Sequence, residues 1–369
     1  MNREPLCSDC EVEAASLSRR RFVQAVGAAT VGTTLLSATS VPRLIFADDA
    51  KPAPKPETPK PEMPKPEMLV KKLYDSFSTE QKEEICFAWD HSDDRGLLRT
   101  HVSNNWQITD VKKLNIAGKF FSKDQQDIIE AIFNGLYNPE WHARIRQQIQ
   151  DDAGGYGKQQ TIALFGQPGT GKFEFVMTGR HLTIRCDGDS TEHVAFGGPI
   201  FYGHAAKGFN EEPSHPGNVF WHQALKANAL FKMLDGKQRE VALVQKGPQE
   251  AKVGFNGKAA KTGIAYSELA ADQKTHLKGV LDALIEPYRS SDQQEVTRCL
   301  TAQGGLEACH LSFFKQDDKG NSVDLGDDGV WDNWRLEGPS FVWSFRGAPH
   351  VHVWVNIADD PNVTLNARG

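Results

Sequence analysis

The chain has 369 residues, 39% of them hydrophobic, and a formal net charge of -6. This length accommodates one large domain or two ordinary ones, and the mild acidity argues against nonspecific binding of nucleic acid, which needs a basic surface. Beyond the first 47 residues, no window holds the roughly eighteen uninterrupted apolar residues of a membrane span, so we expect no stable span in the mature chain.

Residues 1–47 are predicted to be a targeting segment. The stretch 18–24, S-R-R-R-F-V-Q, fits the twin-arginine pattern of Ser or Thr, two arginines, any residue, Phe, an apolar residue and a polar one. An apolar run of small residues follows from Ala25 to Leu36, and Ala47 offers a small residue for cleavage. We therefore expect the twin-arginine export machinery as a partner and a periplasmic or extracellular location. The alternative is a basic flank on an amphipathic helix.

Residues 48–68 are predicted to be an extended linker rich in Pro, Lys and Glu. P-K-P-E-T is followed there by two copies of P-K-P-E-M, the second ending at Met68. Proline at every second or third position holds the backbone extended and leaves no apolar face to bury. At about 3.1 Å per residue, the stretch would form a semi-rigid spacer on the order of 50 Å long.

Residues 69–369 are predicted to form a single globular domain in which one kind of helix start recurs. In three places an apolar residue is followed by Ser or Asp and, three residues further on, by Gln, which is the pattern of an N-cap with its capping-box partner. These pairs are Ser78 with Gln81, Ser122 with Gln125, and Asp235 with Gln238. Ala270 and Gln273 have the same spacing without the capping side chain. Amphipathic helices are expected behind these signals.

The strand patterns lie between and after these helices. Alternating residues predict strands at 173–178, 181–186, 193–196 and 199–202, and the segment from 334 to 355 is expected to join the same sheet. The fold class is therefore α+β, an antiparallel β-sheet meander with amphipathic helices before and between the strands.

A glycine-rich segment at 166–172, G-Q-P-G-T-G-K, matches most of a phosphate-binding P-loop. That motif needs a helix directly after it and a Ser or Thr for magnesium. Here Phe173 follows and begins an alternating strand. We expect a Gly/Pro turn that leads into a hairpin, and no bound nucleotide.

The most site-like stretch is 341–356, which predicts two short strands separated at Arg346–Pro349. Strand side chains alternate between faces, so His350, His352 and Trp354 should share one face. The valines between them should point the other way, into the core.

Several spaced motifs together resemble the domain-of-unknown-function 3500 family (DUF3500). They are F-G-x-P at 165–168, G-x-H at 179–181, an E-E-P-like segment at 211–213, an aromatic-R-x-x-G-P strand at 334–339 and H-x-H at 350–352. The resemblance runs from about residue 69 to the C-terminus. The family often has G-H-H where this chain has Gly179-Arg180-His181. The resemblance implies a shared fold and membership of a group, but the name of the family does not specify a reaction.

The candidate site residues are four histidines, proposed as metal ligands, and two glutamates, proposed as catalytic residues. They are His181, His204, His350 and His352, with Glu211 and Glu212. Neutral imidazole and carboxylate suit transition metals such as zinc, copper or iron, and a glutamate could complete the ligand set or act as a general base. The alternative is a polar cluster that only orders the sheet.

Whether the protein is an enzyme stays open at this point. One hypothesis is an exported metal-dependent enzyme, and the other is an exported binding or structural module with structural histidines. Four cysteines remain in the predicted mature chain: Cys86, Cys186, Cys299 and Cys309. They allow three full pairings, or they are free buried thiols.

Overall fold

The computed structural model describes residues 64–188, 190–205, 211–257, 259, 261–324 and 326–365. Its elements confirm the α+β class, because helices alternate with the strands of one large and mostly antiparallel sheet. The predicted targeting segment and residues 48–63 of the predicted linker lie outside the described residues. Among the helices that are described, none has the length and apolar content needed to cross a membrane.

The large sheet has eleven strands within the described residues, in the order β1-β4-β5-β6-β7-β13-β12-β11-β10-β8, with β9 beside β10. A separate small sheet pairs β2 with β3. The strand bounds are β1 Cys86–Phe87, β2 Ser92–Asp93, β3 Gly96–Leu97, β4 Thr161–Gly166, β5 Phe173–Gly179, β6 Leu182–Cys186, β7 Ile200–His204, β8 Leu243–Val244, β9 Ile264–Ala265, β10 His310–Phe314, β11 Asn333–Glu337, β12 Phe341–Arg346 and β13 Val351–Ile357.

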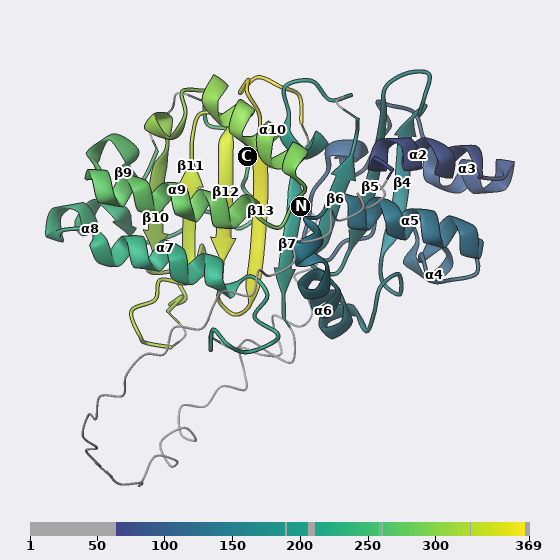
Figure 1. Ribbon diagram of the computed structural model, residues 1–369. Coiled ribbons are helices and arrows are strands. Elements are labelled where there is room, and N and C mark those ends of the chain that lie inside the picture. The colour runs from purple at the N-terminus through teal and green to yellow at the C-terminus, as the bar shows by residue number, and fades with distance from the viewer. Residues whose placement is uncertain are drawn as a thin grey trace, which may run out of the picture.

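The longer helices lie over one face of this sheet (Figure 1). Figure 1 shows α2, α5 and α6 over the half that contains β4 to β6, and α7, α9 and α10 over the half that contains β10 to β13. The helix bounds are α2 Pro66–Asp75, α3 Thr79–Ile85, α4 Val111–Leu114, α5 Lys123–Gly135, α6 His142–Ala153, α7 Trp221–Met233, α8 Gly236–Ala242, α9 Ala271–Ile285 and α10 Ser290–Ala302.

The two halves of the sheet have the same arrangement of strands. From one edge the order is β1-β4-β5-β6-β7, and from the other edge it is β8-β10-β11-β12-β13. In each half a short helix, α3 or α8, leads into a short strand that pairs in parallel with the first strand of an antiparallel meander. The meanders are β4 to β7 and β10 to β13, and they meet through the antiparallel pair β7–β13 at the centre. The last strands of the two halves are therefore neighbours.

The predicted helix starts explain part of this repeat. Ser78, Ser122 and Asp235 form the expected capping boxes, which confirms those three predictions, and the Ala270 N–H donates to Gln273. The four glutamines also bond to each other in pairs, Gln81 with Gln125 at 2.9 Å and Gln238 with Gln273 at 2.8 Å. In each half, the N-termini of two helices are therefore linked by a hydrogen bond between their capping glutamines.

The sheet face away from the helices is covered by two segments, one from each half; the first contains the small β2–β3 sheet. The first lies between β1 and α4 and places Leu98, Trp106 and Ile108 against the sheet. The second follows β8 and places Val253 against Phe201 and Trp354. Residues of β13 that face this side therefore meet loops, whereas Val351, Val353 and Val355 pack into the main core under the helices, as predicted.

Two local expectations were wrong and one was confirmed. α2 begins at Pro66, inside the predicted extended linker, because proline is well accommodated in the first turn of a helix. The predicted strand 193–196 is a turn, in which Phe196 has φ +60° and its N–H donates to Glu295. The segment 166–172 joins β4 to β5 as a hairpin with Gly166 opposite Phe173, as expected.

Candidate metal centre

The three histidines of the candidate centre come from two distant parts of the chain, with His181 and His352 separated by 171 positions. β7 and β13 pair so that His352 lies opposite Gly203, and His350 precedes the first residue of β13. His181 lies in the two-residue turn between β5 and β6, where Gly179 pairs with Leu182. A Cβ at Gly203 would lie 3.2 Å from the His181 ring and 2.0 Å from the Val351 carbonyl oxygen. Glycine at this position therefore lets the turn approach β13.

The three imidazoles meet through their Nε2 atoms. His352 Nε2 lies 2.9 Å from His350 Nε2 and 3.0 Å from His181 Nε2. Each of the three residues is at most 1% exposed. One ligand atom from each lies within 4.8 Å of the others, so the group could hold a metal ion, and within the described residues no carboxylate belongs to it.

Two carboxylates fix the orientation of two of these rings. His181 Nδ1 lies 2.9 Å from Asp152 Oδ2, at the end of α6, and the same carboxylate accepts the Ala205 N–H at 2.9 Å. His352 Nδ1 donates to Glu250 Oε1, which also accepts the Trp354 indole N–H at 3.0 Å. Carboxylates that bond the outer nitrogen of a metal-bound histidine are typical of metal centres, because they set the tautomer and raise the basicity of the ligand.

These hydrogen bonds determine which nitrogens carry protons. A carboxylate can only accept, so His181 and His352 each place their single neutral-state proton on Nδ1. Their Nε2 atoms then face each other at 3.0 Å with two lone pairs and no hydrogen between them. His350 can donate to His352, but its buried Nδ1 has no partner among the described residues. Two bare nitrogens at this distance are what a shared cation would stabilise.

The electrostatic environment favours the neutral form of His350 and His352. Burial, followed by the charge of Arg346, lowers the pKa of His352 to about 3 despite Glu250. Burial and the neighbouring His352 lower the pKa of His350 well below its usual range. Burial acts to raise the pKa of Glu250, but Arg346 and His352 outweigh it and hold that pKa well below normal. Neutral imidazole is the form that binds metal.

Two of the three separations between these nitrogens are close to those of a mononuclear site. Metal–nitrogen bonds of about 2.0–2.1 Å in tetrahedral geometry separate two nitrogen ligands by roughly 3.4 Å. The observed separations of 2.9 and 3.0 Å need a widening of only a few tenths of an ångström. Three nitrogen ligands leave a fourth tetrahedral position for water or substrate.

The other predicted site residues do not belong to the histidine group within the described residues. His204 pairs with Val351 on the central strands, so its side chain lies on the helix side of the sheet, opposite to His352. Its ring stacks on Phe220, and burial lowers its pKa to about 4.

The two predicted glutamates sit in a separate region. Glu211 lies beside Gly326 and close to the carboxylates of Asp328 and Asp324, while Glu212 accepts a hydrogen bond from Ser214 at 3.3 Å. Within the described residues neither joins the histidine group. The acidic residues that contact it are Asp152 and Glu250, which the sequence analysis did not single out.

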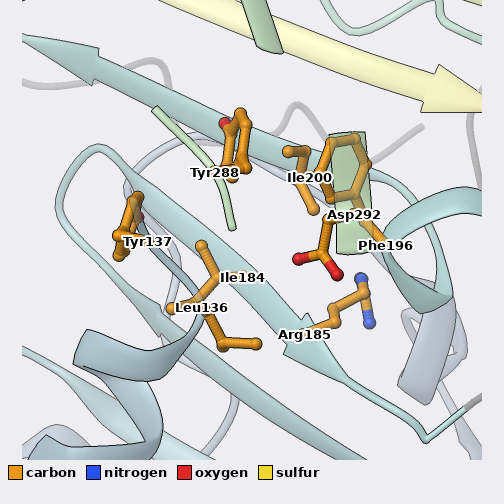
Figure 2. Close-up of a pocket in the computed structure, with 8 residues that line it drawn as sticks. All are labelled: Leu136, Tyr137, Ile184, Arg185, Phe196, Ile200, Tyr288 and Asp292. Carbon is orange, nitrogen blue, oxygen red and sulfur yellow. The ribbon is translucent and has the colours of Figure 1, made fainter. Parts of the chain in front are cut away.

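A small pocket on the helix side offers a less suitable site. Figure 2 shows its lining, which is mainly apolar with one arginine and one aspartate. The lining residues are Leu136, Tyr137, Ile184, Arg185, Phe196, Ile200, Tyr288 and Asp292. The four described cysteines are free thiols, and three of them are buried. Neither feature places three ligand atoms together, as the histidines do.

The fold and the centre together define an α+β protein with a buried cluster of three histidines between two similar halves. The chain belongs to the family described as "Protein of unknown function (DUF3500)", whose model matches residues 63–352. The matched segment includes all three histidines. No curated protein and no solved structure matches the chain.

Proposed function

We propose that the protein is an exported metal-dependent enzyme whose centre is one transition-metal ion on His181, His350 and His352. The observation that carries the proposal is the 3.0 Å contact between the Nε2 atoms of His181 and His352, both of which lack a proton in the neutral state. Imidazole ligands suit zinc, copper and iron. The S-R-R-R-F-V-Q segment near the N-terminus supports export of a folded, metal-loaded protein through the twin-arginine machinery.

An open coordination position favours catalysis over a structural role for the metal. Structural zinc sites are usually closed by four protein ligands, whereas catalytic sites keep one position for water or substrate. A metal bound there would supply a Lewis acid and lower the pKa of a bound water molecule. Asp152 and Glu250 would hold the tautomers of His181 and His352, and the buried rings would exclude bulk water.

Elemental analysis of protein folded in the cytoplasm tests this proposal. We expect about one equivalent of transition metal in the wild type and under about a tenth of an equivalent in His352→Ala, because two nitrogens alone bind such ions weakly. His181→Ala and His350→Ala should behave in the same way. His193→Ala, at an exposed histidine outside the group, is the matched control and should keep its metal.

Two other results would change the assignment. Less than about a tenth of an equivalent in the wild type, even after refolding with added zinc, copper or iron, would leave the histidines as a structural polar cluster. In that case each substitution should only reduce stability, by about 1–3 kcal/mol, through unpaired partners. Loss of metal in His204→Ala would add a fourth ligand and weaken the argument for an open position.

A further inference from the structure

Each half of the molecule places an arginine beside the histidine group. Arg346 of β12 is the cross-strand partner of His352, so the two side chains share a face and lie close together. Its Nη2 donates to the His350 carbonyl oxygen at 3.2 Å. Arg180 precedes His181 in the turn between β5 and β6, and its Nε lies 3.8 Å from Asp152 Oδ1.

The charges of these arginines are already matched by the two carboxylates. Glu250 Oε2 accepts from Arg346 Nη1 at 3.0 Å, and Asp152 faces Arg180. The histidines would bind a metal as neutral ligands. A divalent ion would therefore add two positive charges that no carboxylate in the described ligand group compensates. A buried charge of that size is costly unless an opposite charge accompanies it.

We propose that the metal-loaded centre takes an oxyanionic group of its substrate, a carboxylate or a phosphate, as its fourth ligand, with Arg346 as the neighbouring hydrogen-bond donor. This inference rests on the proposed function. Arg346 Nε is buried and has no acceptor among the described residues, although the two Nη atoms are engaged. A planar guanidinium is well suited to carboxylate and phosphate oxygens.

The exposure of the surrounding side chains indicates how such a ligand would enter. The three histidines are buried. The side chains of Arg346, Arg180 and Glu250 are 16%, 20% and 27% exposed. A ligand that approaches the histidines past these groups meets the two guanidinium groups first. Positive charge along an approach route attracts anions and increases their rate of association.

Cobalt-loaded full-length protein provides the test, because the visible absorption of bound Co(II) reports changes at the fourth position. Acetate, inorganic phosphate and the neutral analogue acetamide are titrated at millimolar concentration. We expect acetate or phosphate to change the spectrum saturably and acetamide to leave it unchanged. A response to acetate alone or to phosphate alone identifies which oxyanion the centre takes.

Two variants examine the role of the arginines. Arg346→Lys keeps the charge but loses Nε, and Arg180→Gln loses the charge at the turn; each should weaken anion binding by about tenfold while cobalt stays bound. Arg298→Lys, at an exposed arginine of α10, is the control and should not change binding. If Arg346→Lys does not retain cobalt, Arg180→Gln carries the comparison.

The failures of the two proposals can be told apart. Cobalt-binding protein that shows no spectral response to either anion would overturn the anion inference and leave the metal centre standing. The same conclusion would follow if both arginine variants bound the anion as tightly as the wild type does. Protein that binds no cobalt overturns the proposed function, and the anion inference with it.

Discussion

Glu250 accepts hydrogen bonds from both His352 and Trp354, two residues of β13 that share one face of the strand. One carboxylate can bond both side chains because residues two positions apart on a strand point the same way. These bonds fix the plane of the His352 ring. Glu250 comes from the irregular segment after β8, so this bond also ties a covering loop to the sheet. A side chain held in this way presents its Nε2 in one direction.

The first prediction concerns the charge of Glu250. Glu250→Gln keeps an oxygen acceptor but removes the negative charge that favours the Nδ1–H tautomer and the basicity of His352. We expect metal affinity to fall by about 10–100-fold, with the far-ultraviolet circular dichroism spectrum unchanged. Calorimetric titration with zinc measures the change. Glu240→Gln, at an exposed glutamate of α8, should bind zinc as the wild type does, and equal affinity in both variants would remove Glu250 from the centre.

The sequence predicted the part of this centre that depends on local periodicity. The alternation of 350–356 placed His350 and His352 on one face and the intervening valines in the core, and both expectations were confirmed. The convergence of His181 depended on the close approach of a turn to Gly203, which is a tertiary contact. Asp152 follows Asp151 at the end of a helix and has the sequence appearance of surface charge.

The role of Glu250, like that of Asp152, could not be predicted from the sequence. It lies in a segment without helical or strand periodicity, and only the folded sheet shows that this segment covers β13. The helix starts were easier, because a capping box is a contact between residues three positions apart. Their arrangement in pairs needed the structure, since Gln81 and Gln125 are joined across 44 positions.

The second prediction concerns these paired capping boxes. Gln81→Ala and Gln125→Ala should each lower the free energy of unfolding, and the double variant should lose less than the sum. The shortfall should be about 0.5–1.5 kcal/mol, since the two amides bond each other. Urea unfolding of the four proteins gives this coupling. Gln81→Ala combined with Gln238→Ala joins different halves and should be additive within about 0.5 kcal/mol.

The third prediction concerns export. Replacement of Arg19 and Arg20 together by lysine should leave the precursor in the cytoplasm, because the twin-arginine machinery recognises the guanidinium pair. Fractionation followed by immunoblotting measures the distribution. Export of the wild type by a strain that lacks the twin-arginine machinery would show that the N-terminal pattern has been misinterpreted.

The fourth prediction concerns Glu211, which the sequence suggested as a catalytic residue. Burial, then the carboxylates of Asp328 and Asp324, raise its pKa to about 7 from an ordinary value of 4.5. The folded state therefore keeps a proton that the unfolded chain releases. A group of this kind contributes stability that is fully present below its unfolded pKa and is lost as pH rises through its folded pKa.

Glu211→Gln should remove this pH dependence, because glutamine fills the same space without titrating. We expect the thermal unfolding midpoints of variant and wild type to be similar at about pH 4 and the variant to unfold at a higher temperature near pH 8. Differential scanning calorimetry across that range measures both proteins, with Glu212→Gln, at an exposed neighbouring position, as the control. If Glu211→Gln were less stable than the wild type near pH 8, the ionised Glu211 carboxylate would have to make a favourable contact there. If Glu211→Gln lost bound metal, Glu211 would have to be counted as part of the metal centre.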